Sequence, residues 1–317
     1  MRIIEDARKV EEFFSNLALT IGSFDGIHLG HQRIIAEVIQ AARAMNGTAA
    51  VMTLRPHPRQ FFAPANAPNI LISDAKKEEI LAQLGVDILY VLPFNQDVAS
   101  MPPDAFLREI VLDRCRAKTL IIGHDFSFGK NAAGDFTFLQ KKAAEYDFEV
   151  RQVPQVVVQG ERVSSTLIRE RILQGEVDRV EALLGRRYSI VGEVIPGRGV
   201  GAKLGVPTAN VSPHHNAVPA HGVYVAHAVL DGRVCPAAVN IGVAPTIRNE
   251  DIVIEAHLLD FSENIIGKRI EIVFHKRLRP EKKFPSIHAL IEAINADIAT
   301  VRRYFLGTGD LSESLTG

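Results

Sequence analysis

The segment TIGSFDGIHLGH, residues 20–31, combines two histidines with closely spaced glycines. His28 and His31 are three residues apart, so their side chains share one face if the segment is helical. The glycines, which permit tight turns and the close approach of a phosphate group, are Gly22, Gly26 and Gly30. Two imidazole donors directed at one point beside such a turn favour the binding of a nucleotide phosphate.

A second set of candidate phosphate ligands lies in SSTLIR, residues 164–169. Its hydroxyl groups suit hydrogen bonds to phosphate oxygens, and the guanidinium of Arg169 suits a bidentate ion pair. A serine or threonine ahead of an apolar run is also a common helix N-cap. The two roles are compatible, so the segment is retained as a phosphate-binding candidate.

Two common nucleotide-binding motifs are missing from the sequence. The chain contains no GxxxxGK[ST] motif and no GxGxxG motif after its first predicted strand. The glycine-rich tract 197–205 is followed by Pro207, which cannot belong to the helix that a dinucleotide-binding motif must open. The sequence therefore supports neither a P-loop ATPase nor a Rossmann dehydrogenase.

The elements that position these residues alternate between strands and helices in the first half of the chain. From Leu17 to about Val158, apolar runs such as TLIIG (119–123) alternate with helical patterns such as HQRIIAEVIQAARAM (31–45). This alternation predicts βαβ units, and hence a doubly wound parallel sheet covered by helices. In such sheets ligands bind beyond the carboxyl ends of strands, where residues 22–31 are expected to lie.

From about residue 186, β-rich segments separated by turn signals replace this alternation. Asp231-Gly232 between two such segments predicts a hairpin, and the amphipathic segment 286–305 predicts a closing helix. A chain of 317 residues also exceeds the roughly 250–300 residues of a single core. We therefore expect an α/β domain over residues 1–185 and a small antiparallel β-barrel domain with a C-terminal helix over residues 186–317.

The composition excludes several classes of protein. Apolar residues make up 47% and charged residues 23% of the chain, and the formal net charge of −1 argues against bulk attraction to nucleic acid or an anionic membrane. Cys115 and Cys235 fall in different halves, so no disulfide framework is expected. No apolar run approaches the roughly 18 residues of a membrane span, and no signal-peptide pattern is present. We expect a cytoplasmic protein with small-molecule partners, either a monomer or a transiently self-associating chain.

Several motifs in combination resemble a known family. GxFDGxHxGH (22–31), PHP (56–58), GHDFSFGK (123–130) and SSTLIR are similar to the adenylyltransferase module of the bacterial bifunctional riboflavin kinase/FMN adenylyltransferases, also called FAD synthetases. GVPTAN (205–210), VNIGVAPT (239–246), IEAHLLDF (254–261) and LRPEKKF (278–284) resemble the riboflavin kinase module in the same order. The resemblance covers about residues 17–305. HxGH occurs in many nucleotidyltransferases, whereas the pairing of PTAN with EAHLLDF is specific to this family.

For the first half, the resemblance implies a nucleotidyltransferase-type sheet and attack of the FMN phosphate on the α-phosphorus of ATP, which yields FAD and pyrophosphate. It implies that His28 and His31 stabilise charge on the transferring group and that Ser165, Thr166 and Arg169 bind the triphosphate. The other residues implied at the nucleotide or the flavin are Gly22, Phe24, Asp25, Gly26, His57, Gly123, Asp125 and Ser164.

For the second half, the resemblance implies that the 5′-hydroxyl of riboflavin attacks the γ-phosphorus of ATP with Glu255 as general base. Thr208 and Asn210 are two residues apart, so both face one side of an extended chain and offer neutral oxygen ligands to Mg²⁺ bound with ATP. The other residues implied at ATP or the flavin are Gly199, Gly201, Lys203, Gly205, Asn240 and Asp297. The chain departs from the family pattern at Ser23, Ile247 and Ile266.

Two other interpretations stay open. One is a different adenylyl- or cytidylyltransferase whose barrel is an unrelated appendage, against which the presence of Thr208, Asn210 and Glu255 argues. The other is a flavin-binding sensor or carrier without turnover, against which the histidine pair and Glu255 argue. The sequence therefore predicts an enzyme that converts riboflavin to FMN and FMN to FAD.

Overall fold

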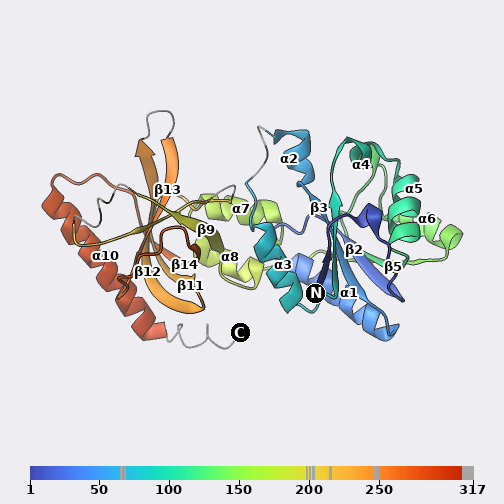
Figure 1. Ribbon diagram of the computed structural model, residues 1–317, viewed down its shortest axis with the longest axis horizontal. Helices are drawn as coiled ribbons and strands as arrows, with labels where there is room; N and C mark the ends of the chain where they lie inside the picture. The colour runs from blue at the N-terminus through green and yellow to red at the C-terminus, as the bar shows by residue number, and fades with distance from the viewer. Residues whose placement is uncertain are drawn as a thin grey trace. The chain divides into compact units, whose positions relative to one another are not determined.

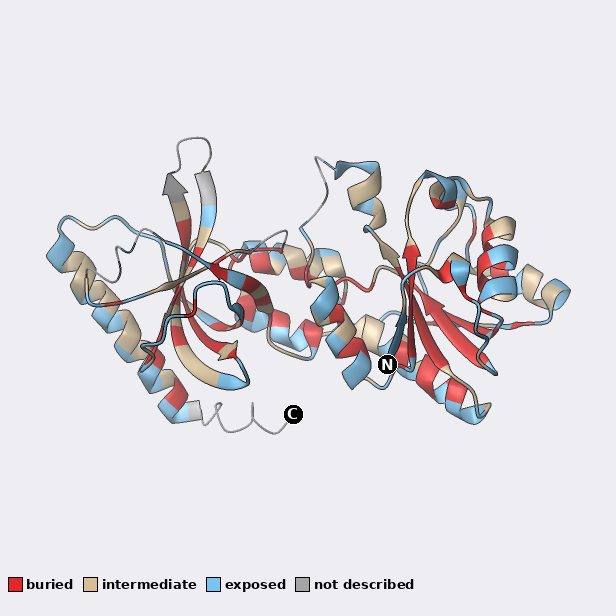
Figure 2. Ribbon diagram, viewed as in Figure 1, coloured by how far each residue is buried: buried red, intermediate tan, exposed pale blue. Residues whose placement is uncertain are grey.

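The computed structural model divides into two compact units (Figure 1). It describes residues 1–64, 67, 69–197, 199, 201, 204–213, 216–245 and 250–308. The first unit contains Met1–Pro68 and Asp74–Ser165, and the second contains Asn69–Ser73 and Thr166–Gly317. In both units the buried residues concentrate on the strands and on one side of the helices (Figure 2).

The first unit is built on a six-stranded sheet with the order β1-β4-β3-β2-β5-β6. The strands are β1 (Arg2–Ile4), β2 (Leu17–Ile21), β3 (Ala49–Arg55), β4 (Ile88–Pro93), β5 (Ala117–Gly123) and β6 (Glu149–Val153). Each strand pairs with its neighbours in parallel. All of β2 and nearly all of β4 is buried, as in parallel sheets covered on both faces. The predicted parallel sheet is confirmed, with β1 as an edge strand that the alternation from Leu17 onward does not include.

Helices connect these strands, and α1 (Leu29–Ala44) packs on β2, β3 and β5. The other helical segments are α2 (Pro58–Phe62), α3 (Asp74–Gln83), α4 (Gln96–Ser100), α5 (Pro103–Ala105), a π-helix (Phe106–Arg114), α6 (Phe136–Tyr146) and two 3-10 turns (Ala7–Lys9 and Lys130–Ala132). A two-stranded ladder of β7 (Val157–Val158) and β8 (Glu161–Arg162) follows β6. Helices thus provide the connections that a parallel sheet requires.

The chain changes direction across the sheet between β2 and β5. It runs from β2 outward through β3 to β4, and then returns to β5 on the other side of β2 before reaching β6. The carboxyl ends of β2 and β5 therefore lie on either side of the point where the strand order reverses. Doubly wound sheets bind their ligands at this point.

The second unit contains a closed barrel with the strand order β10-β13-β12-β11-β14-β9. Its strands are β9 (Ser189–Ile195), β10 (Ala209–Val211), β11 (Gly222–Leu230), β12 (Arg233–Pro245), β13 (Glu250–Leu258) and β14 (Arg269–Pro280). They pair in antiparallel fashion. Asp231 and Gly232 both have positive φ in the β11–β12 turn, as the predicted hairpin requires.

Among the described residues of the second unit, three helices accompany the barrel. These are α7 (Ser165–Leu173), α8 (Val177–Leu184) and α10 (Ile287–Thr308). Val301 and Phe305 of α10 are buried in a cluster with Val225 and Leu259, which fixes this helix on the barrel. The predicted antiparallel barrel with a C-terminal helix is therefore confirmed.

Candidate active sites

The backbone of the loop between β2 and α1 turns tightly. Phe24, Gly26 and Ile27 have φ values of 48°, 86° and 38°. Phe24 is 2% and Asp25 3% exposed, so the loop turns its side chains inward. Left-handed backbone at buried non-glycine residues is costly and gathers at functional sites. The loop is therefore a candidate functional segment at the carboxyl end of β2.

His28 and His31 lie against each other at the start of α1. His28 is the N-cap of this 16-residue helix, and its Nδ1 accepts a hydrogen bond of 3.3 Å from the backbone N–H of His31. The accepting role of Nδ1 leaves the ring proton of His28 on Nε2. The two rings stack with their centroids 3.7 Å apart. A Cβ at Gly30 would lie 3.1 Å from the His28 ring, so glycine makes room for it.

This arrangement differs from the expected one in a single respect. The spacing predicts two histidines on one helical face, whereas His28 precedes the helix and folds back over it. Both rings nevertheless lie at the N-terminus of α1, where unpaired backbone N–H groups and the helix dipole attract anions.

The ring of His31 is held uncharged. Burial lowers the pKa of His31 well below 6.5, and the nearby charges of His28 and Lys77 lower it further. Its Nδ1 is buried and makes no hydrogen bond to the described part of the chain. Because buried polar atoms are seldom unpaired, this nitrogen is suited to contact a ligand.

Other residues of the first unit converge on the same end of the sheet. The Ser165 hydroxyl donates to the backbone oxygen of Asp25 at 2.9 Å, which joins the SSTLIR segment to the β2–α1 loop. Ser164 precedes it and is half-buried. Asp125 follows β5 and forms an ion pair with Arg162 of β8, with a Nη2–Oδ2 distance of 2.5 Å. The β2 loop, SSTLIR and the β5 end are the segments that the sequence singled out.

The backbone at two glycines of this site passes close to other side chains. A Cβ at Gly22 would lie 3.2 Å from the Phe24 ring, and one at Gly123 would lie 3.1 Å from Cδ1 of Ile34 on α1. Larger residues would force these neighbours to move. The two glycines thus allow close packing around the ends of β2 and β5.

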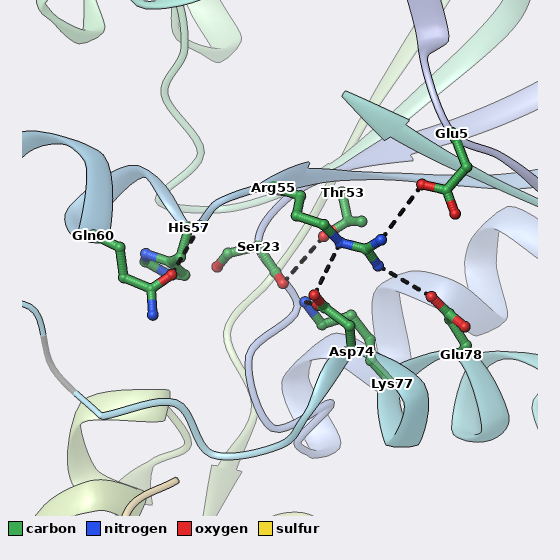
Figure 3. Close-up of polar contacts among 9 residues, drawn as sticks. All are labelled: Glu5, Ser23, Thr53, Arg55, His57, Gln60, Asp74, Lys77 and Glu78. Carbon is green, nitrogen blue, oxygen red and sulfur yellow. Dashed lines mark hydrogen bonds and ion pairs between the residues drawn. The ribbon is translucent and has the colours of Figure 1, made fainter. Parts of the chain in front are cut away.

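Three remaining candidate residues of the first site lie outside the β2–α1 loop and the carboxyl end of β5. Thr166 and Arg169 lie on α7 in the second unit, where Nε of Arg169 donates to the Asn69 carbonyl oxygen at 2.8 Å. His57 is the N-cap of α2: its Nδ1 accepts from the Arg59 N–H at 3.1 Å, and its own N–H donates to Oε1 of Gln60 (Figure 3). The cap gives His57 a structural role, and a role at the flavin stays a prediction.

Two charged residues near this site were not expected from the sequence. Arg162 pairs with Asp125, and Lys77 on α3 is only 8% exposed. Lys77 shares helical spacing with the buried Ile80 and Leu81. A lysine in the apolar stripe of a helix is therefore the signal that could have identified it.

In the second unit, three polar residues form a row across adjacent barrel strands. Glu255 on β13 is paired in register with Asn210 on β10 and with Asn240 on β12. Side chains of directly paired residues point to the same face of a sheet. The neighbours of Glu255, Ile254 and Ala256, are fully buried inside, so the half-buried row lies on the outer face of the barrel.

The glycine-rich segment before β10 packs directly on this row. A Cβ at Gly197 would lie 2.0 Å from Nδ2 of Asn210, and one at Gly201 would lie 3.2 Å from Oγ1 of Thr208. Gly199 and Gly205 have φ values of 68° and 79°, which favour glycine. The two other expected positions here, Lys203 and Ile247, lie outside the described residues.

The last flavin candidate, Asp297 on α10, is ion-paired with Arg279 of β14. The Nη2–Oδ2 distance is 2.7 Å and the Asp297 side chain is 14% exposed. Of the departures from the family pattern, Ile266 is 57% exposed, and the Ser23 carbonyl accepts from the Thr53 hydroxyl at 3.4 Å. A contact between Asp297 and the flavin stays a prediction.

The donor atoms at the barrel row suit a hard cation. Within the described ranges, no group of three or more His, Cys, Asp or Glu side chains could hold a metal ion. Thr208 and Asn210 instead offer neutral oxygens, and Asn210 is paired in register with Glu255. Mg²⁺ commonly takes few protein oxygens together with nucleotide phosphates, so these residues fit it.

Comparison with known proteins matches each half of the chain to a different family model. Residues 10–167 match FAD synthetase, and residues 184–305 match riboflavin kinase. The chain is 37% identical to a bifunctional riboflavin kinase/FMN adenylyltransferase of Pseudomonas fluorescens over 95% of its length and 97% of that protein. It is 35% identical to the protein of the same name in Haemophilus influenzae, with 96% and 99% covered.

A solved structure also matches the chain over most of its length. A crystal structure of a macrolide-efflux protein from Streptococcus pneumoniae is 29% identical, with a TM-score of 0.85 and 95% of this chain and 98% of that chain covered. Across the part of the present chain that the structure describes, every helix is too short or too polar to cross a bilayer. With relatives above 30% identity covered almost end to end, the chain belongs to the family of bifunctional riboflavin kinase/FMN adenylyltransferases.

Proposed function

We propose that this chain catalyses two successive reactions at two sites. Residues 186–317 transfer the γ-phosphate of ATP to riboflavin to form FMN, and residues 1–185 transfer the adenylyl group of ATP to FMN to form FAD and pyrophosphate. The proposal depends on the observation that each half contains a separate group of polar side chains. In the first half these are the stacked rings of His28 and His31 at the start of α1, and in the second half they are Asn210, Glu255 and Asn240 in a row across the barrel strands.

The adenylyl transfer needs charge stabilisation more than a base. The phosphate of FMN is already an anion, so its oxygen can attack the α-phosphorus while the bond to the leaving pyrophosphate breaks. His28 Nε2–H, the uncharged His31 ring and the N-terminus of α1 stabilise the negative charge that the α-phosphoryl group carries. The imidazoles act here as fixed hydrogen-bond donors.

The other residues of the first site bind and orient the two substrates. Ser164, Ser165, Thr166 and Arg169 hold the triphosphate of ATP, and Asp125 meets the nucleotide at the end of β5. The Ser165–Asp25 hydrogen bond couples this segment to the loop that holds the histidines. The glycines of the β2–α1 loop allow the close approach of a phosphate, and His57 contacts the flavin. These roles are supported by the match of residues 10–167 to FAD synthetase.

The phosphorylation of riboflavin needs a base because its nucleophile is a neutral alcohol. Glu255 takes the proton of the 5′-hydroxyl as the oxygen attacks the γ-phosphorus and the bond from that phosphorus to the leaving ADP breaks. Asn210 and Asn240 flank Glu255 in the row and orient the groups beside it. The backbone at Gly199, Gly201 and Gly205 wraps the phosphates of ATP. A Mg²⁺ ion held by Thr208 and Asn210 would neutralise phosphate charge in this step.

Phosphorus labelling tests both assignments with the purified chain. With riboflavin and γ-labelled ATP, label should appear in FMN; with FMN and α-labelled ATP, label should appear in FAD. With FMN and γ-labelled ATP, label should leave in pyrophosphate and never enter FAD. Labelled FAD in that third reaction would contradict the proposed chemistry, and no labelled flavin in any reaction would favour a flavin-binding carrier.

We also propose that the protein is located in the cytoplasm. Cys115 and Cys235 are free thiols in the structure, as is usual in a reducing compartment.

A further inference from the structure

Lys77 is a buried cation that the proposed mechanism does not use. It lies on α3 with only 8% of the residue exposed, whereas lysines are mostly exposed in folded proteins. Removing an ammonium group from water is costly unless it is paired, so a buried lysine needs a physical reason for its place.

A chain of ion pairs fixes this lysine to the end of β3 (Figure 3). Nζ of Lys77 lies 3.5 Å from Oδ1 of Asp74, and Oδ2 of Asp74 lies 2.9 Å from Nε of Arg55. Arg55 also pairs with Glu78 at 3.0 Å and with Glu5 at 3.4 Å. Asp74 is therefore shared between two cations and lies closer to Arg55. It neutralises the charge of Lys77 only in part.

This chain of ion pairs lies beside the loop that holds the histidines. β3 neighbours β2 in the sheet, and the hydroxyl of Thr53, two residues before Arg55, donates to the carbonyl oxygen of Ser23. In Figure 3 the Lys77 ammonium lies at the Asp74 carboxylate. The ion pairs of Arg55 and the Thr53–Ser23 hydrogen bond thus connect the same end of β3 to Asp74 and to the segment that follows β2.

The electrostatic interactions of Lys77 with Asp25 and His31 agree with a position near the β2–α1 loop. Burial lowers the pKa of Lys77, while the negative charges of Asp74 and Asp25 oppose that shift. The positive charge of Lys77 in turn contributes to the lowered pKa of His31. Lys77 is therefore coupled electrostatically to both a loop carboxylate and one ring of the histidine pair.

We propose that Lys77 is a positioning residue for adenylyl transfer, and that its buried ammonium, paired with the Asp74 carboxylate that Arg55 also binds, supplies a fixed positive charge near Asp25 and His31. This inference rests on the proposed function of residues 1–185. The charge opposes the negative charge of the buried Asp25 carboxylate near the expected position of the phosphates of FMN and ATP. Lys77 neither gives nor takes a proton in the reaction; it lowers the free energy of bringing the anionic groups to the carboxyl end of the sheet.

Two variants of Lys77 separate its charge from its shape. Lys77→Gln removes the charge while keeping a donor to Asp74, and Lys77→Arg keeps the charge. Lys76→Gln on the same helix, where Lys76 pairs with Glu79 at 3.0 Å, is the matched control. The assay measures kcat and KM for FAD formation from FMN and ATP, and riboflavin phosphorylation in each preparation reports that the chain is folded.

We expect Lys77→Gln to lower kcat/KM for FAD formation on the order of 10-fold or more, mainly through KM for the phosphate substrates, with riboflavin phosphorylation unchanged. Lys77→Arg should keep most of the activity, and Lys76→Gln all of it. In Lys77→Gln the pKa of His31, followed by NMR titration, should rise because a nearby positive charge is gone.

Several outcomes would overturn this inference. Lys77→Gln kinetics equal to those of Lys76→Gln, or equal losses in the Gln and Arg variants, would show that the charge is not what matters. An unchanged pKa of His31 in Lys77→Gln would show that the two groups are not coupled. If the wild-type chain forms no FAD at all, the proposed function itself fails together with the inference.

Discussion

Lowering the pH is expected to destabilise the first unit through His31. In the folded chain burial keeps the pKa of this ring well below 6.5, whereas in the unfolded chain it has its ordinary value. Above pH 6.5 the ring is uncharged in both states, and the stability does not depend on it. As the pH falls below that value, the unfolded chain binds the proton first. The free energy of unfolding then falls by up to about 1.4 kcal/mol per pH unit, until the folded ring also protonates.

The variant His31→Gln isolates this contribution because glutamine does not titrate. Urea unfolding of the ligand-free chain, followed by far-UV circular dichroism, is measured for both proteins. Between pH of about 7.5 and about 5.5, the wild type should lose about 1.4 kcal/mol more than the variant. With two units the unfolding can show two transitions, and the one that differs between the proteins belongs to the first unit. Equal pH dependence in both proteins would refute the conclusion that His31 is buried and uncharged.

The remaining predictions concern the two sites separately. Replacing His28 and His31 together by alanine should lower the rate of FAD formation by about 100-fold or more while FMN formation is kept, and parallel loss of both rates would contradict the assignment. Glu255→Gln should do the converse, since the alcohol loses its base; a native rate of riboflavin phosphorylation would show that another group is the base. Gly192→Ala should destabilise the barrel by about 3 kcal/mol, because its Cβ would lie 2.2 Å from the Ser212 carbonyl oxygen. A thermal unfolding midpoint equal to that of the wild type would contradict this last estimate.

The sequence predicts those parts of the fold in which the local pattern of apolar residues is strong. The strands at the centre of the first sheet are apolar along their length because helices cover both faces, so the alternation with helices predicted them. Strand β1 has only three residues within a charged segment. Its place is fixed by parallel pairing with β4, more than eighty residues away in sequence, which no local pattern reveals.

The sequence proposes residues for the candidate sites but does not give their geometry. The spacing of His28 and His31 indicated a shared face, yet the stacking of the rings depends on the cap conformation of His28 and on the space at Gly30. Glu255 was expected on a strand, whereas its position between Asn210 and Asn240 depends on the strand register of a closed barrel. Strand register is set by pairing between residues far apart in the sequence, so local sequence patterns do not reveal it directly.

Lys77 shows where reading the sequence alone falls short. Its helical spacing with Ile80 and Leu81 places it on a buried face. Its partner Asp74 comes from the start of α3, and Arg55, which also pairs with Asp74, comes from the end of β3. A lysine at such a position is tolerated only once these partners are assembled, and the tertiary structure brings them together.

The most direct test of the two-site account is a time course of flavin species. The purified chain is incubated with riboflavin, ATP and Mg²⁺, and riboflavin, FMN and FAD are separated by chromatography at successive times. The account predicts that FMN appears first and that FAD follows as FMN is consumed. FMN without FAD would contradict the function assigned to the histidine site, and the absence of both products would contradict the account as a whole.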